Sequence, residues 1–368
     1  MQRLFTYALV VIAILYGSAH AFTTYPHEYF TNEPEPVIPT VRHIALLLPL
    51  KSPSFGQAAE VVREGFVAAT MRERQLPLPI RIYSTTDDPL DILIAYHQAL
   101  DAGAVLIVGP LTRDGVSALA SSGVIDVPII TLNAADNETG FPPNLYLFGL
   151  QMENEASQIA EFAMTENKRH AIIINDGGSL SIRLQTAFTQ RWLAEYGHTA
   201  ESLQYVENPD ILAQFREYTE GENNVIFLAL DAAKSRFVRS YLSPDTPVFA
   251  TSQIFIDNDD SLFNHDLNGI RFMDMPWIIQ LDHPAVMAYR HTVKARSTDM
   301  ERLYALGIDA FRLMALTLQV QAPHEISFDG VTGHVRFIHP NHFIREPIAA
   351  KFENGRVLLQ KPRKERKY

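Results

Sequence analysis

Short apolar runs alternate with amphipathic stretches along most of the chain, beginning at His43. In the first cycle, the run HIALLL at 43–48 precedes a stretch at 55–74 whose apolar residues recur at helical spacing. The runs carry Ile, Leu and Val at successive positions, which is typical of parallel strands covered by helices on both faces. Strands that alternate with helices indicate a doubly wound α/β sheet.

The alternation falls into two groups, one ending near residue 150 and one running from 153 to 252 without repeating the sequence. A chain of 368 residues also exceeds the usual size of one domain. We therefore predict two α/β units, each with its own core. The expected strands are 43–48, 78–84, 104–110, 127–133, 144–150, 170–176, 199–206, 223–231 and 247–252, and the expected helices are 55–74, 89–102, 113–122, 153–166, 179–196, 209–220 and 232–241.

The last third of the chain mixes patterns. Residues 269–279 look extended, and 284–296 and 300–321 look helical, with Gly307 inside the second helix indicating close packing against a neighbour. The segment 326–338 predicts a hairpin, because Asp329-Gly330 and Gly333 interrupt it. A final strand pair is expected to turn at Asn354-Gly355, before a basic tail at 359–368.

The N-terminus has the pattern of an export signal. Arg3 precedes an apolar run at 7–16, and Ala19-His20-Ala21 fits a signal-peptidase site, so we predict a signal peptide at 1–21 cleaved after Ala21. The alternative is an uncleaved anchor, although the run is shorter than the roughly 20 residues of a spanning helix. Residues 22–40 hold four prolines and are expected to form a linker.

The composition of the chain excludes several kinds of partner and several kinds of catalytic or metal-binding site. The net charge of −11 gives no general attraction to nucleic acid or to anionic lipid, so no nucleic-acid partner is expected. The chain contains no cysteine, which excludes disulfides, thiolate nucleophiles and cysteine-ligated metals. A lipoprotein anchor also requires a cysteine after the signal, so we expect a periplasmic protein without a lipid anchor.

The sequence shows little sign of catalytic chemistry. It has no GxGxxG, P-loop or HExxH motif, and His334, His339 and His342 are not spaced for a metal site. Ser179 in DGGSLS follows a strand, but the glycine that a nucleophile elbow needs after the serine is missing, and we interpret Ser179 as a helix N-cap. No catalytic residue, metal or cofactor is expected.

Small and polar residues follow the predicted strands. In open parallel sheets, ligands bind outside the carboxyl ends of the strands. Two facing units would form a cleft there, although turns and helix caps favour the same residue types. The candidates for its lining are Ser52, Ser54, Phe55, Gly109, Asn133, Asp231 and Thr251.

Several segments, in order and spacing, resemble the LppC/LpoA family of penicillin-binding protein activators. They are IALLLPLKSPSFGQAAEVVREGFVAA, LIVGPLTRDGVSALA, VPIITLN, LYLFGLQMENEASQIAEFA, LYALGIDAFRL, ISFDGVTGHVRF and IREPIAAKFENGRV. The resemblance covers about 41–358, and the pair LYALGIDAF and FDGVTGHVRF is its most specific part. Well-known members of this family are lipoproteins with an N-terminal helical repeat domain, and this chain departs from them in both respects.

The resemblance implies two Rossmann-like lobes joined by a hinge, as in type I periplasmic binding proteins. The chain would cross between lobes near 149, 277 and 324, which assigns 41–148 and 278–323 to lobe 1 and 149–277 and 324–358 to lobe 2. It also implies a non-enzymatic role, in which the protein binds and activates a class A penicillin-binding protein in peptidoglycan synthesis.

Two other functions stay open at this point. A solute-binding protein would hold a small, amino-acid-like metabolite in the cleft and gain affinity by hinge closure. An enzyme would need a cluster of groups with perturbed pKa values, and the sequence does not display one.

Overall fold

The computed structural model describes residues 40–72, 76, 78–123, 125–136, 140–256, 261–289, 296–320, 322–338 and 340–360. The predicted signal peptide, the linker up to residue 39 and the tail from residue 361 lie outside the described residues. Val41–Tyr368 forms one compact unit, separate from Met1–Thr40, and the fold below is that of this unit.

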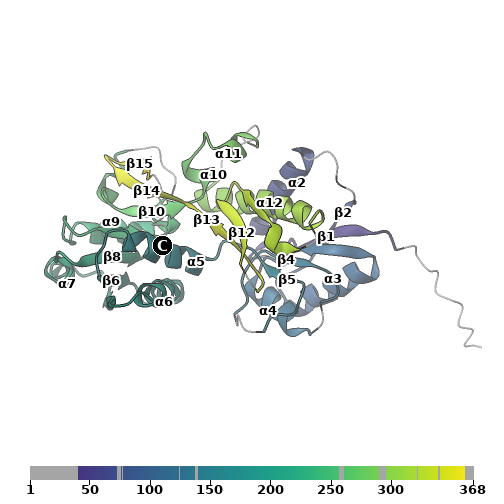
Figure 1. The fold of residues 1–368 in the computed structure, drawn as a ribbon, viewed down its shortest axis with the longest axis horizontal. Helices are drawn as coiled ribbons and strands as arrows, with labels where there is room; N and C mark the ends of the chain where they lie inside the picture. The colour runs from purple at the N-terminus through teal and green to yellow at the C-terminus, as the bar shows by residue number, and fades with distance from the viewer. Residues whose placement is uncertain are drawn as a thin grey trace, which may run out of the picture. The chain divides into compact units, whose positions relative to one another are not determined.

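Its described strands form two mostly parallel sheets with helices on both faces (Figure 1). The first sheet has the strand order β11-β12-β13-β5-β4-β3-β1-β2. β1 to β5 and β13 run parallel, and β12 runs antiparallel to its two neighbours, β11 and β13. We call this sheet and its helices the first lobe. Its elements are β1 (His43–Leu48), α2 (Gly56–Arg72), β2 (Ile80–Ser84), α3 (Pro89–Asp101), β3 (Ala104–Val108), α4 (Arg113–Ser121), β4 (Ile129–Thr131), β5 (Leu145–Leu147), α10 (Pro276–Ile279), α11 (Pro284–Met287), α12 (Thr298–Thr317), η5 (Pro323–Glu325), β11 (Ser327–Asp329), β12 (His334–Ile338) and β13 (His342–Glu346).

The second sheet, with its helices, is the second lobe. Its strand order is β15-β14-β10-β9-β8-β6-β7, in which β6 to β10 run parallel and β14 runs antiparallel to its two neighbours, β10 and β15. Its elements are α5 (Met152–Met164), β6 (His170–Asn175), α6 (Ser179–Leu193), β7 (Thr199–Gln204), α7 (Pro209–Leu212), α8 (Phe215–Thr219), β8 (Asn224–Ala229), α9 (Ala232–Arg239), β9 (Val248–Ala250), η2 (Ser252–Ile254), η3 (His265–Leu267), β10 (Arg271–Asp274), β14 (Ile348–Glu353) and β15 (Arg356–Leu359).

Continuous apolar strands let both faces of each sheet carry a core. In β1, Ile44 and Leu46 pack with α2 and α12, whereas Ala45 and Leu47 point to the other face and pack with α3 and α4. Side chains alternate across a strand, so a run such as HIALLL serves two cores at once. The same division occurs in β8, where alternate residues face α9 on one side and α5 and α6 on the other.

The first lobe is closed on one face by a tight crossing of α2 and α12. A Cβ on Gly307 would lie 2.1 Å from the carbonyl oxygen of Val62, and a Cβ on Gly65 would lie 2.0 Å from that of Tyr304. Each helix thus contributes a glycine where the other backbone passes. The predicted close packing at Gly307 is confirmed.

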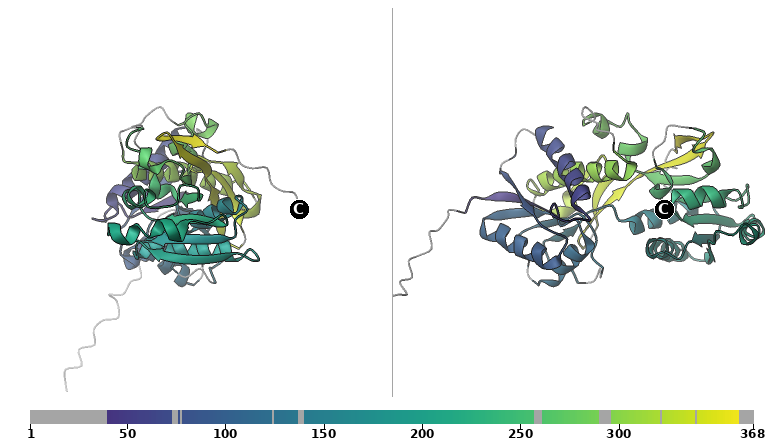
Figure 2. Two further views of the ribbon diagram at one scale, coloured as in Figure 1. Left: turned by 90° about the vertical axis from the view of Figure 1, so that its left-hand side faces the viewer. Right: turned by 180° about the vertical axis from the view of Figure 1, so that it is seen from behind.

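The hairpin at 326–338 forms as predicted, but its assignment to the second lobe is wrong. Together with β13 it extends the first sheet, because His342 of β13 pairs with Leu147 of β5, and the Asn341 side chain donates to the carbonyl oxygen of Leu145 at 2.7 Å. The last passage between sheets therefore lies between β13 and β14, near Pro347, rather than near 324 (Figure 2). A hairpin sequence specifies its own turn but not the strand that it joins.

Other boundaries also differ from the sequence prediction. Residues 276–279 form α10 rather than continuing an extended segment, since proline suits the first turn of a helix. The helix expected at 209–220 is divided into α7 and α8. Of the helix expected at 284–296, α11 ends at Met287, and 290–295 lie outside the described residues. The N-cap of α6 is Gly178, not Ser179, which is already helical.

Candidate functional site

The carboxyl end of β1 leads into the loop that carries Ser52, Ser54 and Phe55. The buried Ser52 hydroxyl accepts hydrogen bonds from the backbone N–H groups of Ser54, at 3.2 Å, and Phe55, at 3.0 Å. These bonds order the turn that starts α2. Ser54 and Phe55 are exposed, as are Lys51 and Pro53, so Ser52 is the residue of this loop that is buried.

Gly109 ends β3 and has a backbone role. Its φ is +109°, and a Cβ at this position would lie 1.9 Å from the carbonyl oxygen of Leu47. Only glycine fits where this backbone passes β1.

Asn133 follows β4 and ties two loops together. Its side-chain amide donates to the carbonyl oxygen of Leu111 at 2.9 Å, and its side-chain oxygen accepts from the Ala134 N–H at 2.9 Å. The polar atoms of this side chain are thus already engaged within the fold.

In the second lobe, Asp231 is the N-cap of α9 and accepts from the Lys234 N–H at 2.8 Å. The Lys234 ammonium bonds Asp176, at the end of β6, and lies 3.3 Å from Asp231. The hydrogen bond to Asp176 raises the pKa of Lys234. Thr251 ends β9 and is buried, and its hydroxyl has no hydrogen-bond partner among the described residues.

Strand order divides the seven candidates into two sets. β1, β3 and β4 are neighbours and carry Ser52, Ser54, Phe55, Gly109 and Asn133, whereas β8 and β9 carry Asp231 and Thr251. Their assignment to a ligand-binding cleft stays a prediction.

A buried polar network that the sequence did not reveal joins the lobes. Glu155 of α5 accepts hydrogen bonds from the N–H of Ser252 and, at 3.1 Å, from its hydroxyl. Arg345 of β13 approaches the same carboxylate at 3.4 Å. Burial raises the pKa of Glu155, and the Arg345 charge opposes this shift.

Arg302 of α12 extends the network from the first lobe into the second. It donates to Asp274 at 2.7 Å and to the carbonyl oxygens of Ser252 and Phe255 at 3.0 and 2.9 Å, and it pairs with Asp299 at 2.8 Å. Burial lowers the pKa of Arg302, but the carboxylates of Asp274, Asp299 and Glu155 together outweigh burial and raise it. A hinge motion that moves α12 away from η2 must break these bonds.

Glu153 adds a second link between the lobes. It accepts from Arg113 of α4 at 2.6 Å and from Arg183 of α6 at 2.8 Å. Burial alone would raise the pKa of Glu153, but a backbone hydrogen bond and the two arginines outweigh it and lower the pKa.

The space beside the Glu155–Arg345 pair is small. A cavity of about 10 Å³ is lined by both residues and by Gln158. That volume suits about one water molecule and excludes a solute.

The two most specific segments of the family resemblance meet at Asp309. Its buried carboxylate accepts from the N–H groups of Val331, at 3.1 Å, and Thr332, at 2.7 Å, and from the Thr332 hydroxyl at 2.7 Å. A Cβ on Gly330 would lie 2.3 Å from this carboxylate, so glycine is required where the turn passes. The motif pair therefore fixes the β11–β12 turn on α12.

The described residues contain no cluster of three or more histidine, aspartate or glutamate side chains suited to a metal ion. Among the same residues, no helix has the length and apolar character required to cross a bilayer.

Two parallel sheets covered by helices, between which the chain passes three times, define a protein of the type I periplasmic binding protein-like class. The family model described as "LppC putative lipoprotein" matches residues 37–220 and 220–355. The chain belongs to this family.

Among curated proteins, the chain is similar to the penicillin-binding protein activator LpoA of Haemophilus influenzae. The two are 24% identical over 303 residues, covering 80% of this chain and 51% of that protein. The chain spans about half the length of the curated relatives it matches, and these relatives are named as activators.

Two solved structures share the fold. Full-length LpoA of H. influenzae has a TM-score of 0.74 at 21% identity, covering 88% of this chain and 59% of that one. A Chromobacterium violaceum protein described as "a putative branched-chain amino acid ABC transporter" has a TM-score of 0.73 at 32% identity, covering 85% of this chain and 100% of that one.

Proposed function

We propose that this chain is a non-enzymatic regulator that binds and activates a class A penicillin-binding protein in peptidoglycan synthesis. The observation that carries the proposal is the similarity to LpoA over 80% of the chain. The residues matched by the family model include the segments that meet at Asp309. The buried bonds of Arg302 and Glu155 support it, because a docking platform gains from lobes held in one arrangement.

The test is a polymerisation assay with purified class A synthases from the same cell. We expect the chain to form a complex with one synthase and to raise its rate of glycan polymerisation. Arg302→Met, which loosens the link between lobes, is expected to activate less. Arg191→Met removes a surface pair with Glu161 within the second lobe and is the matched control. Absence of both a complex and a rate change would refute the proposal.

The second candidate function is binding of a small metabolite by residues at the strand ends. It is favoured by the 32% identity to the C. violaceum protein described as a putative branched-chain amino acid transporter. Ser54 and Phe55 would face the ligand, and the unpartnered Thr251 hydroxyl would donate to it. The other candidates, Ser52, Gly109, Asn133 and Asp231, would shape the loops.

A thermal-shift screen with amino acids and muropeptides tests this candidate. A ligand that raises the melting temperature in the wild type, but not in Thr251→Val, would support it. A screen in which no compound raises the melting temperature would contradict this candidate and leave activation of a penicillin-binding protein as the remaining proposal.

We also propose that the chain acts in the periplasm after export. N-terminal sequencing of the protein from a periplasmic fraction is expected to begin at Phe22, the residue after the proposed cleavage site. A protein found uncleaved in the membrane fraction would contradict this.

A further inference from the structure

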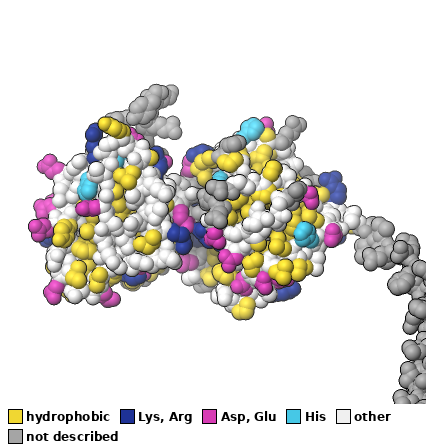
Figure 3. Space-filling view, turned by 90° about the horizontal axis from the view of Figure 1, so that it is seen from below, with side chains coloured by type: hydrophobic (Ala, Val, Ile, Leu, Met, Phe, Trp, Pro, Cys, Tyr) yellow, Lys and Arg dark blue, Asp and Glu magenta, His cyan; other side chains and the backbone are white. Residues whose placement is uncertain are grey.

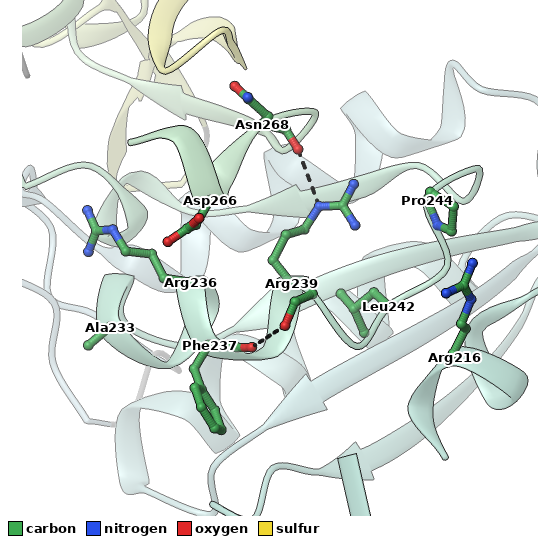
Figure 4. Close-up of a pocket in the computed structure, with 10 residues that line it drawn as sticks. Arg216, Ala233, Arg236, Phe237, Arg239, Leu242, Pro244, Asp266 and Asn268 are labelled. Atoms are coloured by element: carbon green, nitrogen blue, oxygen red, sulfur yellow. Dashed lines mark hydrogen bonds between the residues drawn. The ribbon is translucent and has the colours of Figure 1, made fainter. Parts of the chain in front are cut away.

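A cavity of about 730 Å³ lies beside α9, away from the strand ends considered above (Figure 4). Since α9 leaves the carboxyl end of β8 and returns toward β9, its last turn lies near the amino ends of these strands. The cavity is lined by residues of α8, α9, η3 and the loops that follow α9 and η3, namely Arg216, Ala233, Arg236, Phe237, Arg239, Ser240, Leu242, Pro244, Asp266 and Asn268.

The lining is basic in a chain of net charge −11. It contains three arginines against one aspartate. Acidic side chains occur on both lobes of the face shown in Figure 3. The field of the whole protein therefore repels anions, and a local cluster of arginines is a departure from it.

Arg239 is half-buried. Its Nε donates to the carbonyl oxygen of Asn268 at 3.3 Å, and burial lowers its pKa. Within the described residues, no carboxylate pairs with Arg239 or with Arg216. A half-buried guanidinium without a carboxylate is a costly arrangement that an incoming anion would relieve.

Arg236 is held at the other end of the cavity. Its guanidinium lies 4.0 Å from the centre of the Phe263 ring, and its Nε donates to the carbonyl oxygen of Phe263 at 3.3 Å. Burial lowers the pKa of Arg236, and Asp266 partly offsets this. These contacts fix the side chain and leave its charge uncompensated by a direct ion pair among the described residues.

The three charges are spread along the cavity and do not converge. In Figure 4, Arg239 and Arg216 extend toward Pro244, whereas Arg236 points away from them on the far side of Asp266. Leu242 and Pro244, which also line the cavity, lie on the Arg216 side in Figure 4. One small oxyanion could not contact all three guanidinium groups, but an extended chain with several carboxylates could. Arginine forks pair well with carboxylates.

We infer that this cavity, which we call the arginine pocket, binds an extended acidic segment of a partner protein that carries apolar residues between its carboxylates. This inference is independent of the activation of a penicillin-binding protein proposed above and of any ligand that binds at the strand-end loops. Arginine and aromatic residues are also the types that contribute most to protein interfaces.

Fluorescence anisotropy with the full chain tests the inference. The probe is a fluorescein-labelled peptide of alternating glutamate and leucine, and a lysine–leucine peptide is its control. We expect saturable binding of the acidic peptide that weakens with added salt. In the double variant Arg216→Gln/Arg239→Gln, the Kd is expected to rise at least about tenfold.

Arg356→Gln is the matched control, because Arg356 is exposed on β15 of the same lobe and the charge change per site is equal. Its Kd is expected to stay at the wild-type value, and unchanged melting temperatures would show that the variants fold. Arg216→Gln alone, at an exposed position, gives a second measurement if the double variant is unstable.

Three results would overturn the inference. They are no binding of the acidic peptide, equal loss in Arg356→Gln and the double variant, or displacement of the peptide by an equimolar amount of inorganic phosphate. The last result would identify a site for a small oxyanion. Because no synthase is present, failure here leaves the proposed activation untouched, and failure of activation leaves this result untouched.

Discussion

At the scale of single residues, most polar side chains near the strand ends serve the fold before any ligand. Ser52 orders the start of α2, Asn133 joins two loops, and Asp231 caps α9. Gly109 gives β1 room to pass. The buried charges at Arg302 and Glu155, which have no local sequence signature, hold the two lobes together.

Arg302→Met is expected to lower the free energy of unfolding by about 3–5 kcal/mol, because it leaves Asp274 buried without its partner. Urea denaturation measures this. Arg191→Met, which removes an exposed pair with Glu161, should cost at most about 1 kcal/mol. Equal losses in the two variants would mean that the buried pair adds nothing beyond a surface contact.

The lowered pKa of Glu153 predicts that the stability of the folded protein depends on pH. Its pKa in the folded protein lies below the ordinary 4.5, so between these values the unfolded chain binds more protons and stability rises with pH. The stability advantage of the wild type over Glu153→Gln should be complete above pH 4.5 and disappear as the pH falls through the lowered pKa. Chemical denaturation at a series of pH values checks this, and an advantage that persists in acid would contradict it.

At the scale of elements, the first lobe depends on how closely α2 and α12 approach. Two glycines, one on each helix, allow the contact, and the Asp309 carboxylate on α12 then holds the β11–β12 turn. The most specific family segments are thus explained by packing and hydrogen bonding within one lobe.

Gly307→Ala is expected to destabilise the protein by about 1–3 kcal/mol, although alanine favours a helix by about 1 kcal/mol over glycine. The new methyl group would overlap the Val62 carbonyl oxygen. Thermal unfolding measures the change, with Gln57→Ala on the exposed side of α2 as control. A Gly307→Ala protein as stable as the wild type would show that the helices can separate without cost.

At the scale of the whole molecule, the links through Arg302, Glu155 and Glu153 oppose hinge bending. A solute receptor needs two arrangements of its lobes that differ in affinity for the ligand. Buried bonds that must break for the lobes to move raise the free energy of the second arrangement, which favours a platform for a protein partner.

Spin labels on the two lobes test this directly, because the chain has no native cysteine to interfere. We expect one narrow distance distribution for labels at Lys51→Cys and Glu207→Cys, unchanged by amino acids or muropeptides. Adding Arg302→Met should broaden it. A shift on adding one of these ligands would favour the receptor function instead.

The class of fold and the positions of most strands and helices could be predicted from the pattern of apolar residues. The apolar runs at β1, β6 and β8 could be recognised as strands because burial on both faces requires apolar residues at successive positions. The close approach at Gly307 could also be predicted, since a glycine inside a helix destabilises that helix unless close packing offsets the loss.

The sheet that the β11–β13 segment joins and the charges that meet between the lobes could not be predicted in this way and are seen only in the folded protein. β13 pairs with β5, and Asn341 reaches Leu145 across 196 positions of sequence. Glu155 and Arg345 are 190 positions apart, and the three arginines of the arginine pocket come from two helices. The spacing of apolar residues shows which faces of a segment are buried, but it does not show which distant segment packs against them. Pairing of strands and charges is therefore fixed by the packed chain as a whole.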